Sequence, residues 1–554
     1  MSRYLNIAVA AALMASGQMV WAKDQSAAYA MPDTYSAQVV ETIFAQGGNA
    51  VDAAVASAFA LAVTFPEAGN IGGGGFMTIY MNGKPYFLDY REVAPIAATR
   101  DMYLDDKGEV IENMSVVGAK AAGVPGTVMG MWEAHRKFGK LKWELLLQPA
   151  IDYAQNGFVV ANEQSLYKVD AEQMYGGKTN FSKYFGNLKT GVTFKQPELA
   201  QTLQRIAKNG ADEFYRGQTA QLLVAQMQRD NGLIAMQDLH KYKAKWRQPL
   251  SFKWRDNVIH TAPLPSSGGI ALRQLLGMKE ARSQDFNNVA LNTSQYMHLI
   301  AEIEKRVFAD RGQYLGDPDF NKVPVKKLTS DAYLKQRASE VNAQAISSTE
   351  GVKPGLESAH TTHFSILDKD GNAVANTYTL NWDYGNGVVV EGAGFLLNDE
   401  MDDFSAKAGV ANMFGVIGAD ANAIEPGKRM LSSMTPTIIT TKGDVSLVIG
   451  TPGGSRIFTS IFQVINNLYD HQLPLQQAVD AQRFHHQLFP KDVIYYDDFA
   501  PITGPTAERL TAMGYQVEDQ GWRLGDVQAV YVKDGEVFAA SDRRGRGKSA
   551  ILKY

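Results

Sequence analysis

A threonine at the start of a predicted strand is the residue best placed to act as a nucleophile. Thr361 follows a polar stretch, residues 342–360, that has little apolar periodicity, and it begins a segment that alternates like a β-strand. A cut between His360 and Thr361 would give Thr361 a free α-amine. One residue would then hold both a hydroxyl nucleophile and its base. The sequence therefore suggests a precursor that cleaves itself before Thr361.

The strand that begins at Thr361 is predicted to form a hairpin with residues 373–381. A three-residue loop, Lys369-Asp370-Gly371, pairs Asp368 with Asn372 and places Thr379 opposite Thr361. Asn381 lies two residues further on and would share that face of the sheet. A two-residue loop would instead place Leu380 opposite Thr361 and would remove this grouping.

Three other polar segments are either ligand sites or plain turns. Residues 398–404 contain four carboxylates, but they lack the ligand spacing of a calcium loop, and on composition alone they suggest a solvated acidic turn. An isolated pair such as Ser432-Ser433 is typical of a turn. Pro452-Gly453-Gly454 precedes a predicted helix, so its N–H groups could face an anion. An ordinary strand-to-helix turn explains that last segment equally well.

The sequence gives no support for cysteine-based, phosphate-binding or metal-binding sites. The chain has no cysteine, which removes disulfides, thiolate catalysis and Cys-based metal sites. Neither Gly72–Gly75 nor Gly453-Gly454 continues into the Gly-Lys-Ser/Thr of a phosphate loop. The histidines at 360, 363, 485 and 486 lack metal-ligand spacing, so we predict no metal and no cofactor. A net charge of −4 gives no indication of a nucleic-acid or anionic-membrane partner.

The N-terminus has the pattern of a targeting segment. Arg3 precedes an apolar run, Ile7–Ala15, that is too short to span a bilayer. Val20-Trp21-Ala22 resembles a cleavage site, which gives a signal peptide over 1–22 and a mature start at Lys23. A short N-terminal anchor is the alternative. We expect an exported protein that is periplasmic if bacterial, or secreted, with no membrane span.

The remaining pattern predicts one layered body of 554 residues with strands near both ends and helices between. The expected elements are a helix from about 38, a buried helix over Ala50–Val63, strands at Phe76–Tyr80 and Pro85–Tyr90, mostly helices from about 142 to 300, a strand at Val445–Ile449 and a helix over Arg456–Asp470. Residues 176–194 are rich in Gly, Asn and Lys and suggest an irregular surface excursion.

In combination these segments closely resemble the γ-glutamyltranspeptidases, also called glutathione hydrolases. The resemblance covers nearly the whole mature chain, and its order makes it specific. It rests on Gly47–Ala54, Ala68–Phe76, Asp89–Glu92, Gly123–Thr127, Pro265–Gly269, Tyr314–Pro318, Thr361–His363, Met401–Phe404, Leu431–Met434 and Pro452–Ser455.

The resemblance implies an α+β Ntn-hydrolase fold, a four-layer αββα sandwich of two stacked antiparallel sheets between helix layers. It implies autocleavage into a large subunit, 23–360, and a small subunit, 361–554, that stay together as a heterodimer. The implied donor is a γ-glutamyl compound such as glutathione or glutamine, and the implied acceptor is water, an amino acid or a peptide.

Site residues follow from the resemblance position by position. Thr361 is implied as the nucleophile, Thr379 as the residue that orients it, and Gly453 and Gly454 as oxyanion donors. Positions that match the α-carboxylate site are Arg91, Ser432 and Ser433, and those that match the α-ammonium site are Asn381, Glu400 and Asp403. This implication reverses the first interpretation of the acidic segment as a solvated turn.

Some residues depart from the family pattern. They are Trp382 and Asp383 after Asn381, Met430 in place of a usual Pro, Phe414 in the implied lid, and a basic C-terminal stretch, residues 542–548, that we expect to be a surface tail. Two rivals stay open. One is a β-lactam side-chain acylase for glutaryl substrates on the same fold, and the other is an uncleaved pseudoenzyme or binding protein for γ-glutamyl peptides.

Overall fold

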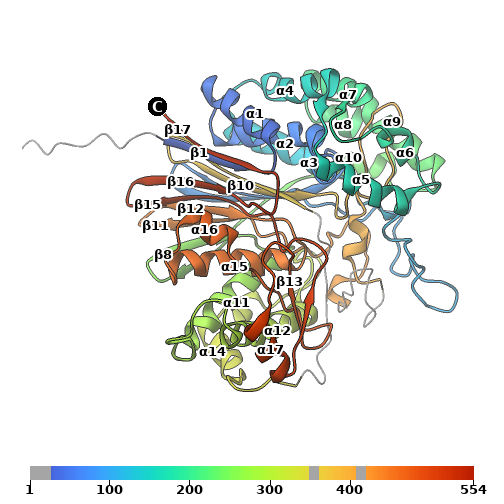
Figure 1. Ribbon diagram of the computed structural model, residues 1–554. Coiled ribbons are helices and arrows are strands. Elements are labelled where there is room, and N and C mark those ends of the chain that lie inside the picture. Colours follow the sequence, from blue (N-terminus) through green and yellow to red (C-terminus); the bar gives the residue numbers. More distant parts are fainter. Residues whose placement is uncertain (1–25, 349–360, 407–419) are drawn as a thin grey trace, which may run out of the picture.

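The computed structural model describes residues 26–348, 361–406 and 420–554. Two large antiparallel sheets lie face to face, and a layer of helices covers the outer face of each (Figure 1). This four-layer α+β arrangement is the expected one. Among the described residues, every helix is too short or too polar to serve as a bilayer-crossing segment.

The first sheet has seven strands in the order β17-β1-β9-β10-β2-β3-β6, and the second has six in the order β16-β15-β12-β11-β8-β7. The strands of the first sheet are β1 (Ser26–Met31), β2 (Gly74–Met81), β3 (Lys84–Asp89), β6 (Lys245–Arg247), β9 (Thr362–Leu367), β10 (Ala373–Thr379) and β17 (Lys548–Lys553). Those of the second are β7 (Leu250–Trp254), β8 (Asn257–Thr261), β11 (Thr437–Thr441), β12 (Asp444–Gly450), β15 (Gln528–Lys533) and β16 (Glu536–Ser541).

The helices divide between the two outer faces (Figure 1). Over the first sheet lie α1 (Thr34–Ala45), α2 (Ala50–Thr64), α3 (Thr127–Phe138), α4 (Trp143–Asn156), α5 (Asn162–Tyr175), α6 (Phe181–Phe185), α7 (Pro197–Asn209), α8 (Asp212–Arg216), α9 (Gln218–Arg229) and α10 (Met236–Lys241). Over the second lie α11 (Gly268–Ala281), α12 (Ser294–Tyr314), α14 (Asp331–Ser339), α15 (Arg456–Tyr469), α16 (Leu475–Asp480) and α17 (Gly504–Met513), together with α13 (Val325–Leu328).

Strand alternation explains why a separate core forms on each covered face of the two sheets. In β9, Phe364 and Ile366 pack into the core under α1 and α2, whereas Leu367 joins the core between the sheets. Val448 of β12 belongs to the inter-sheet core, and its neighbours Leu447 and Ile449 belong to the core under the second helix layer. Successive side chains of a strand point to opposite faces, so a sheet covered on both sides is apolar throughout.

The early helices and hairpin form as expected from local signals. Asn49 caps α2, and Asp52 completes a reciprocal capping box with it. Every residue of α2 is buried, which accounts for its Ala- and Val-rich composition. β2 and β3 pair through the turn at Asn82-Gly83. These predictions are confirmed.

Two predictions about the middle of the chain are only partly correct. Most of residues 176–194 are exposed and most lie outside helices and strands, as expected, but the stretch also contains α6 and ends in β5 (Thr193–Phe194), which pairs with β4 (Phe158–Val159). Phe181, Phe185 and Leu188 of this stretch are buried. Residues 142–300 are mostly helical, as expected, but that interpretation missed the short strands β6, β7 and β8, which are too brief to give a clear periodic signal.

The basic C-terminal stretch is not a surface tail. Arg544 forms buried ion pairs with Asp497 and Asp542. Arg546 pairs with Glu67 and lies over the Phe65 ring, 3.9 Å from its centroid. The chain then enters the first sheet as β17, against β1. These cations neutralise buried carboxylates, a role that composition alone does not reveal.

Candidate active site

Thr361 lies immediately before β9, between the two sheets, and its side chain is 9% exposed. β9 and β10 pair as Tyr378 with Thr362 and Ala373 with Leu367, which confirms the predicted hairpin register. The Oγ1 of Thr361 lies 3.4 Å from the Oγ1 of Thr379. Thr379 Oγ1 also accepts a hydrogen bond from the backbone N–H of Asn381, at 2.8 Å. The predicted grouping of these three residues is therefore present.

The glycine run before β2 holds the end of β10 in place. Asn70 donates from Nδ2 to the carbonyl of Thr379 at 2.9 Å, and its Oδ1 accepts from Gly73 N–H at 3.0 Å. A Cβ on Gly73 would lie 2.1 Å from the carbonyl oxygen of Thr379. Only glycine allows the backbone to approach this closely. Asn70 is therefore a positioning residue, and the local sequence pattern gives no indication of this role.

Arg91 is the centre of the charged part of the site. It lies after β3, is fully buried, and donates to the carboxylates of Glu400 and Asp403. Its Nε also reaches the carbonyl of Met430 at 3.3 Å. The Met430 contact uses only the backbone, so the departure from Pro at this position leaves this contact unchanged. Because Glu400 and Asp403 are buried, the segment around them is not a solvated turn.

The carboxylates around Arg91 outnumber the cations. Burial raises the pKa of Glu400 well above its usual range and raises that of Asp403, although Arg91 opposes both shifts. Burial also raises the pKa of Glu92 to about 8 and that of Asp402 to about 7. Glu400 Oε2 and Asp403 Oδ1 are buried without a hydrogen-bond partner among the described residues. An added cation would satisfy these oxygens.

Ser432 and Ser433 come from the segment before β11, which is tied to the start of α11. Ser267 donates from its backbone N–H to the carbonyl of Ser432 at 2.7 Å, and its Oγ lies 3.2 Å from the Oγ of Ser433. Arg311 of α12 donates from Nε to Ser267 Oγ at 3.1 Å. The serine pair is therefore a buried, cross-linked turn. Burial lowers the pKa of Arg311 to about 10. The local sequence gives no indication that this buried cation lies beside the site.

Gly453 and Gly454 connect β12 to α15 in a conformation that favours glycine. Their φ angles are 135° and 57°, and the carbonyls of both accept from the first turn of α15, at Arg456 and Ile457. Among the described residues, no hydrogen bond from either backbone N–H is found. These donors are available to an anion at the N-terminal end of a helix.

One small cavity collects the predicted residues. Its lining includes Arg91, Thr361, Thr379, Asn381, Glu400, Asp403, Ser432, Ser433 and Gly454. We call it the arginine cavity. Gly453 is adjacent to Gly454 in the same turn, whereas His360 and Phe414 lie outside the described residues. Residues from positions as distant as 91 and 454 thus meet around one threonine hydroxyl.

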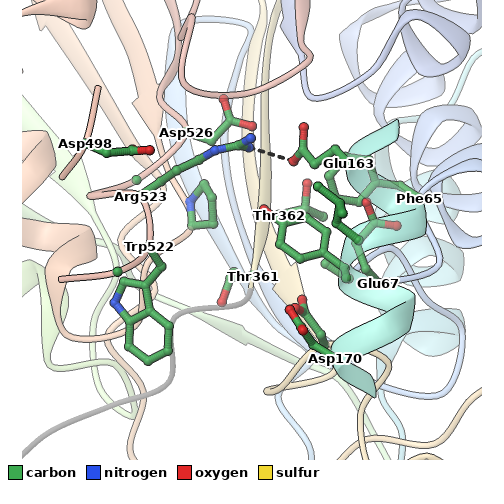
Figure 2. A pocket seen from close by; sticks show the side chains of 17 residues that line it. Phe65, Glu67, Glu163, Asp170, Thr361, Thr362, Asp498, Trp522, Arg523 and Asp526 are labelled. Atoms are coloured by element: carbon green, nitrogen blue, oxygen red, sulfur yellow. Dashed lines mark hydrogen bonds and ion pairs between the residues drawn. The ribbon is translucent and has the colours of Figure 1, made fainter. Parts of the chain in front are cut away.

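A larger cavity of about 400 Å³ also has Thr361 in its lining (Figure 2). We call it the carboxylate cavity, because its lining contains Glu67, Glu163, Asp170, Asp383, Asp498 and Asp526. Arg523 and Trp522 also line it, and Arg523 forms an ion pair with Glu163 at 2.6 Å. Asp383, one of the residues that differ from the family pattern, lines this cavity. The ring of Trp382 packs edge to face against the ring of Trp522, with 5.9 Å between the ring centroids.

Comparison with known proteins agrees with this geometry. The family model described as gamma-glutamyltranspeptidase matches residues 36–552. The glutathione hydrolase proenzyme of Pseudomonas aeruginosa is 67% identical over 551 residues, which cover 100% of this chain and 99% of that protein. A solved γ-glutamyltranspeptidase chain from Pseudomonas nitroreducens, complexed with L-DON, is 65% identical and covers 58% of this chain and 96% of its own length, with a TM-score of 0.58.

A more distant structure supports the fold. The cephalosporin acylase of Bacillus halodurans has a TM-score of 0.81, with 24% identity and 95% of both chains covered. Identity at this level shows a shared fold alone. The family model, by contrast, extends over nearly the full sequence, and the relative from P. aeruginosa matches along its whole length. The chain is therefore an enzyme of the γ-glutamyltranspeptidase family.

Proposed function

We propose that this protein is a proenzyme that cuts itself between His360 and Thr361 and then acts as a γ-glutamyltransferase and glutathione hydrolase. The large subunit would be residues 23–360 and the small subunit 361–554, after removal of a signal peptide over 1–22 on export to the periplasm or the medium. The observation that carries the proposal is the position of Thr361 beside a buried arginine–carboxylate site in the arginine cavity.

The arginine cavity suits the α-amino acid end of a γ-glutamyl group. Arg91 would bind the α-carboxylate in a bidentate manner, with Ser432 and Ser433 donating hydroxyl hydrogen bonds. Glu400 and Asp403 would bind the α-ammonium through their buried, unpartnered oxygens, with Asn381 beside them. A zwitterion brings both charges together, so the cavity gains no net charge when it is filled.

Self-cleavage would use the same hydroxyl. Thr361 Oγ1 attacks the carbonyl carbon of His360, the C–N bond of that peptide breaks, and the nitrogen takes up a proton to become the α-amine of Thr361. The resulting ester is then opened by water, which returns the Thr361 hydroxyl and leaves a carboxylate on His360. Thr379 Oγ1, 3.4 Å from the nucleophile, would orient it in both reactions.

The mature reaction follows from the new amine. A free α-amine has a pKa of about 7.7–8.0, so part of it is neutral at pH 7 and accepts the hydroxyl proton, directly or through water. The oxygen attacks the γ-carbonyl, and the N–H groups of Gly453 and Gly454 would stabilise the oxyanion, a contribution of roughly 3–4 kcal/mol per donor in other enzymes. The amine leaves with a proton. Water then releases glutamate, or an amino acid or peptide takes the γ-glutamyl group.

The proposal is tested by its first chemical step. Purified protein should give two chains on a denaturing gel, and the smaller should begin Thr-Thr-His-Phe. Thr361→Ala should abolish both cleavage and the hydrolysis of a γ-glutamyl anilide. A Thr361→Ala protein that still hydrolyses this substrate would refute the proposal.

The acylase alternative is tested with a matched pair of substrates. A glutaryl anilide lacks only the α-ammonium, so Glu400 and Asp403 would have no cation to bind. We expect a much lower kcat/KM for the glutaryl compound than for the γ-glutamyl compound. A preference for the glutaryl anilide would assign the protein to side-chain acylases, and an uncleaved chain that binds γ-glutamyl peptides would assign it to pseudoenzymes.

A further inference from the structure

We propose that the carboxylate cavity binds the acceptor amine and selects one that carries a second positive charge and no carboxylate, as an aliphatic diamine does. The inference rests on the proposed function, because it assigns the partner that meets the γ-glutamyl group on Thr361. The proposed function allows water, an amino acid or a peptide as acceptor, and the inference adds that a diamine without a carboxylate is preferred over these amines.

The position of the cavity assigns it to the amine side of the reaction. Thr361 is the only described residue that lines both the arginine cavity and the carboxylate cavity. With the α-carboxylate and α-ammonium of the donor in the first cavity, the γ-carbonyl lies at Thr361. The leaving group attached to that carbonyl, and the acceptor amine that replaces it, would then extend into the carboxylate cavity. Thr362, on the opposite face of β9, lines only this second cavity.

The charge of the lining favours a cation. Six carboxylates and a single guanidinium line the cavity, and that guanidinium, Arg523, is already paired with Glu163 (Figure 2). Arg546 contacts Glu67 and Glu163 from outside the lining. Burial raises the pKa of Asp526 to about 7, so this carboxylate is only partly charged at neutral pH. The lining still carries an excess of negative charge when the contacts of Arg546 and the partial charge of Asp526 are taken into account. This excess attracts cations and repels a carboxylate.

Independent features suit the rest of such a ligand. Thr362 is 1% exposed, and its Oγ1 has no hydrogen-bond partner among the described residues, so a hydroxyl acceptor is available for an ammonium N–H. Leu166, Tyr167 and Trp522 supply apolar surface for a methylene chain. Asp170 and Asp498 are exposed members of the lining, so either carboxylate is accessible to the partly hydrated far ammonium of a diamine.

The test compares three acceptors of similar length. With a γ-glutamyl anilide as donor, kcat/KM for transfer is measured for putrescine, n-pentylamine and γ-aminobutyrate. The first ends in an ammonium, the second in a methyl and the third in a carboxylate. After correction for its two equivalent amines, putrescine should be the best acceptor and γ-aminobutyrate the poorest. Added NaCl should reduce the difference, because exposed charges are screened.

Charge-neutral variants connect the preference to the cavity. Asp170→Asn and Asp498→Asn should each lower the putrescine-to-pentylamine ratio by roughly two- to fivefold, as expected for a partly exposed charge pair. Asp256→Asn removes the same charge from the exposed turn between β7 and β8, outside the cavity, and should leave the ratio unchanged.

Two results would overturn the inference. One is a corrected ratio of one or less in the unaltered enzyme, and the other is an Asp170→Asn, Asp498→Asn double variant with the ratio of the unaltered enzyme. In either case hydrolysis of the anilide without acceptor would show that the proposed function stands. Loss of that hydrolysis in the unaltered, cleaved enzyme would instead overturn the proposed function itself.

Discussion

The hydroxyl of Thr379 performs two tasks at one atom, since it contacts Thr361 Oγ1 and accepts the Asn381 N–H. Its removal would take away the hydroxyl that accepts the Asn381 N–H and that lies beside the nucleophile. We predict that Thr379→Val slows both self-cleavage and kcat by roughly 10- to 100-fold, in line with the cost of a lost buried hydrogen bond. Thr379→Ser keeps the hydroxyl and should retain most of both rates. Cleavage time courses and kcat measure the effect, and equal rates for Val and wild type would contradict it.

The buried carboxyl of Asp402 makes the free energy of unfolding depend on pH. Its Oδ1 accepts from Ser115, but burial still raises its pKa to about 7, against about 3.9 in an unfolded chain. Between these two pH values the Asp402 carboxyl is protonated in the folded state and ionised in the unfolded chain. The free energy of unfolding therefore falls as pH rises, by up to about 1.4 kcal/mol per pH unit. Asp402→Asn removes this loss.

The Asp402 prediction is measured as a difference between two proteins. The melting temperature of Asp402→Asn relative to wild type should increase from pH 5 to pH 8. An offset that stays constant with pH would mean that Asp402 is ionised in the folded protein.

At the scale of elements, the glycine run before β2 positions the end of β10. Gly73→Ala would press a methyl group against the carbonyl of Thr379, which Asn70 also holds. We predict slow or absent self-cleavage in Gly73→Ala, with secondary structure by circular dichroism close to that of wild type. Gly83→Asn is the control, because that turn has open space and asparagine tolerates its φ of 74°. Normal cleavage of Gly73→Ala would show that the backbone accommodates the methyl group elsewhere.

At the scale of the whole molecule, each large sheet contains strands from both sides of Thr361. In the first sheet β9 and β10 lie between β1 and β2, and β17 pairs with the other edge of β1. In the second sheet β11 pairs with β8. A cut before Thr361 therefore breaks one peptide bond but no strand pairing and no core.

The two chains should consequently stay together after cleavage. We predict that the cleaved protein elutes from a sizing column as one species that contains both chains, and that they separate only under denaturing conditions. Arg546→Met should weaken this association, because it leaves Glu67 of the large subunit buried without its cation from the small subunit. Separation of the chains in native buffer would contradict the prediction.

The sequence by itself determined the nucleophile hypothesis, the Thr361–Thr379 register and the early helices and hairpins. These depend on neighbours in the chain: a loop of defined length fixes which residues face each other, and Asn49 with Asp52 caps its own helix. The arginine-cavity residues were assigned by family resemblance, since an acidic segment and a serine pair look like turns on local grounds.

Only the tertiary structure decided which charges are buried and what faces them. It placed Arg544 and Arg546 among interior carboxylates, brought six acids from distant segments into the lining of one cavity beside Thr361, and buried Phe181, Phe185 and Leu188 within residues 176–194. The physical reason is that burial and electrostatic partners arise from contacts between segments far apart in the chain, for which the local pattern carries no signal.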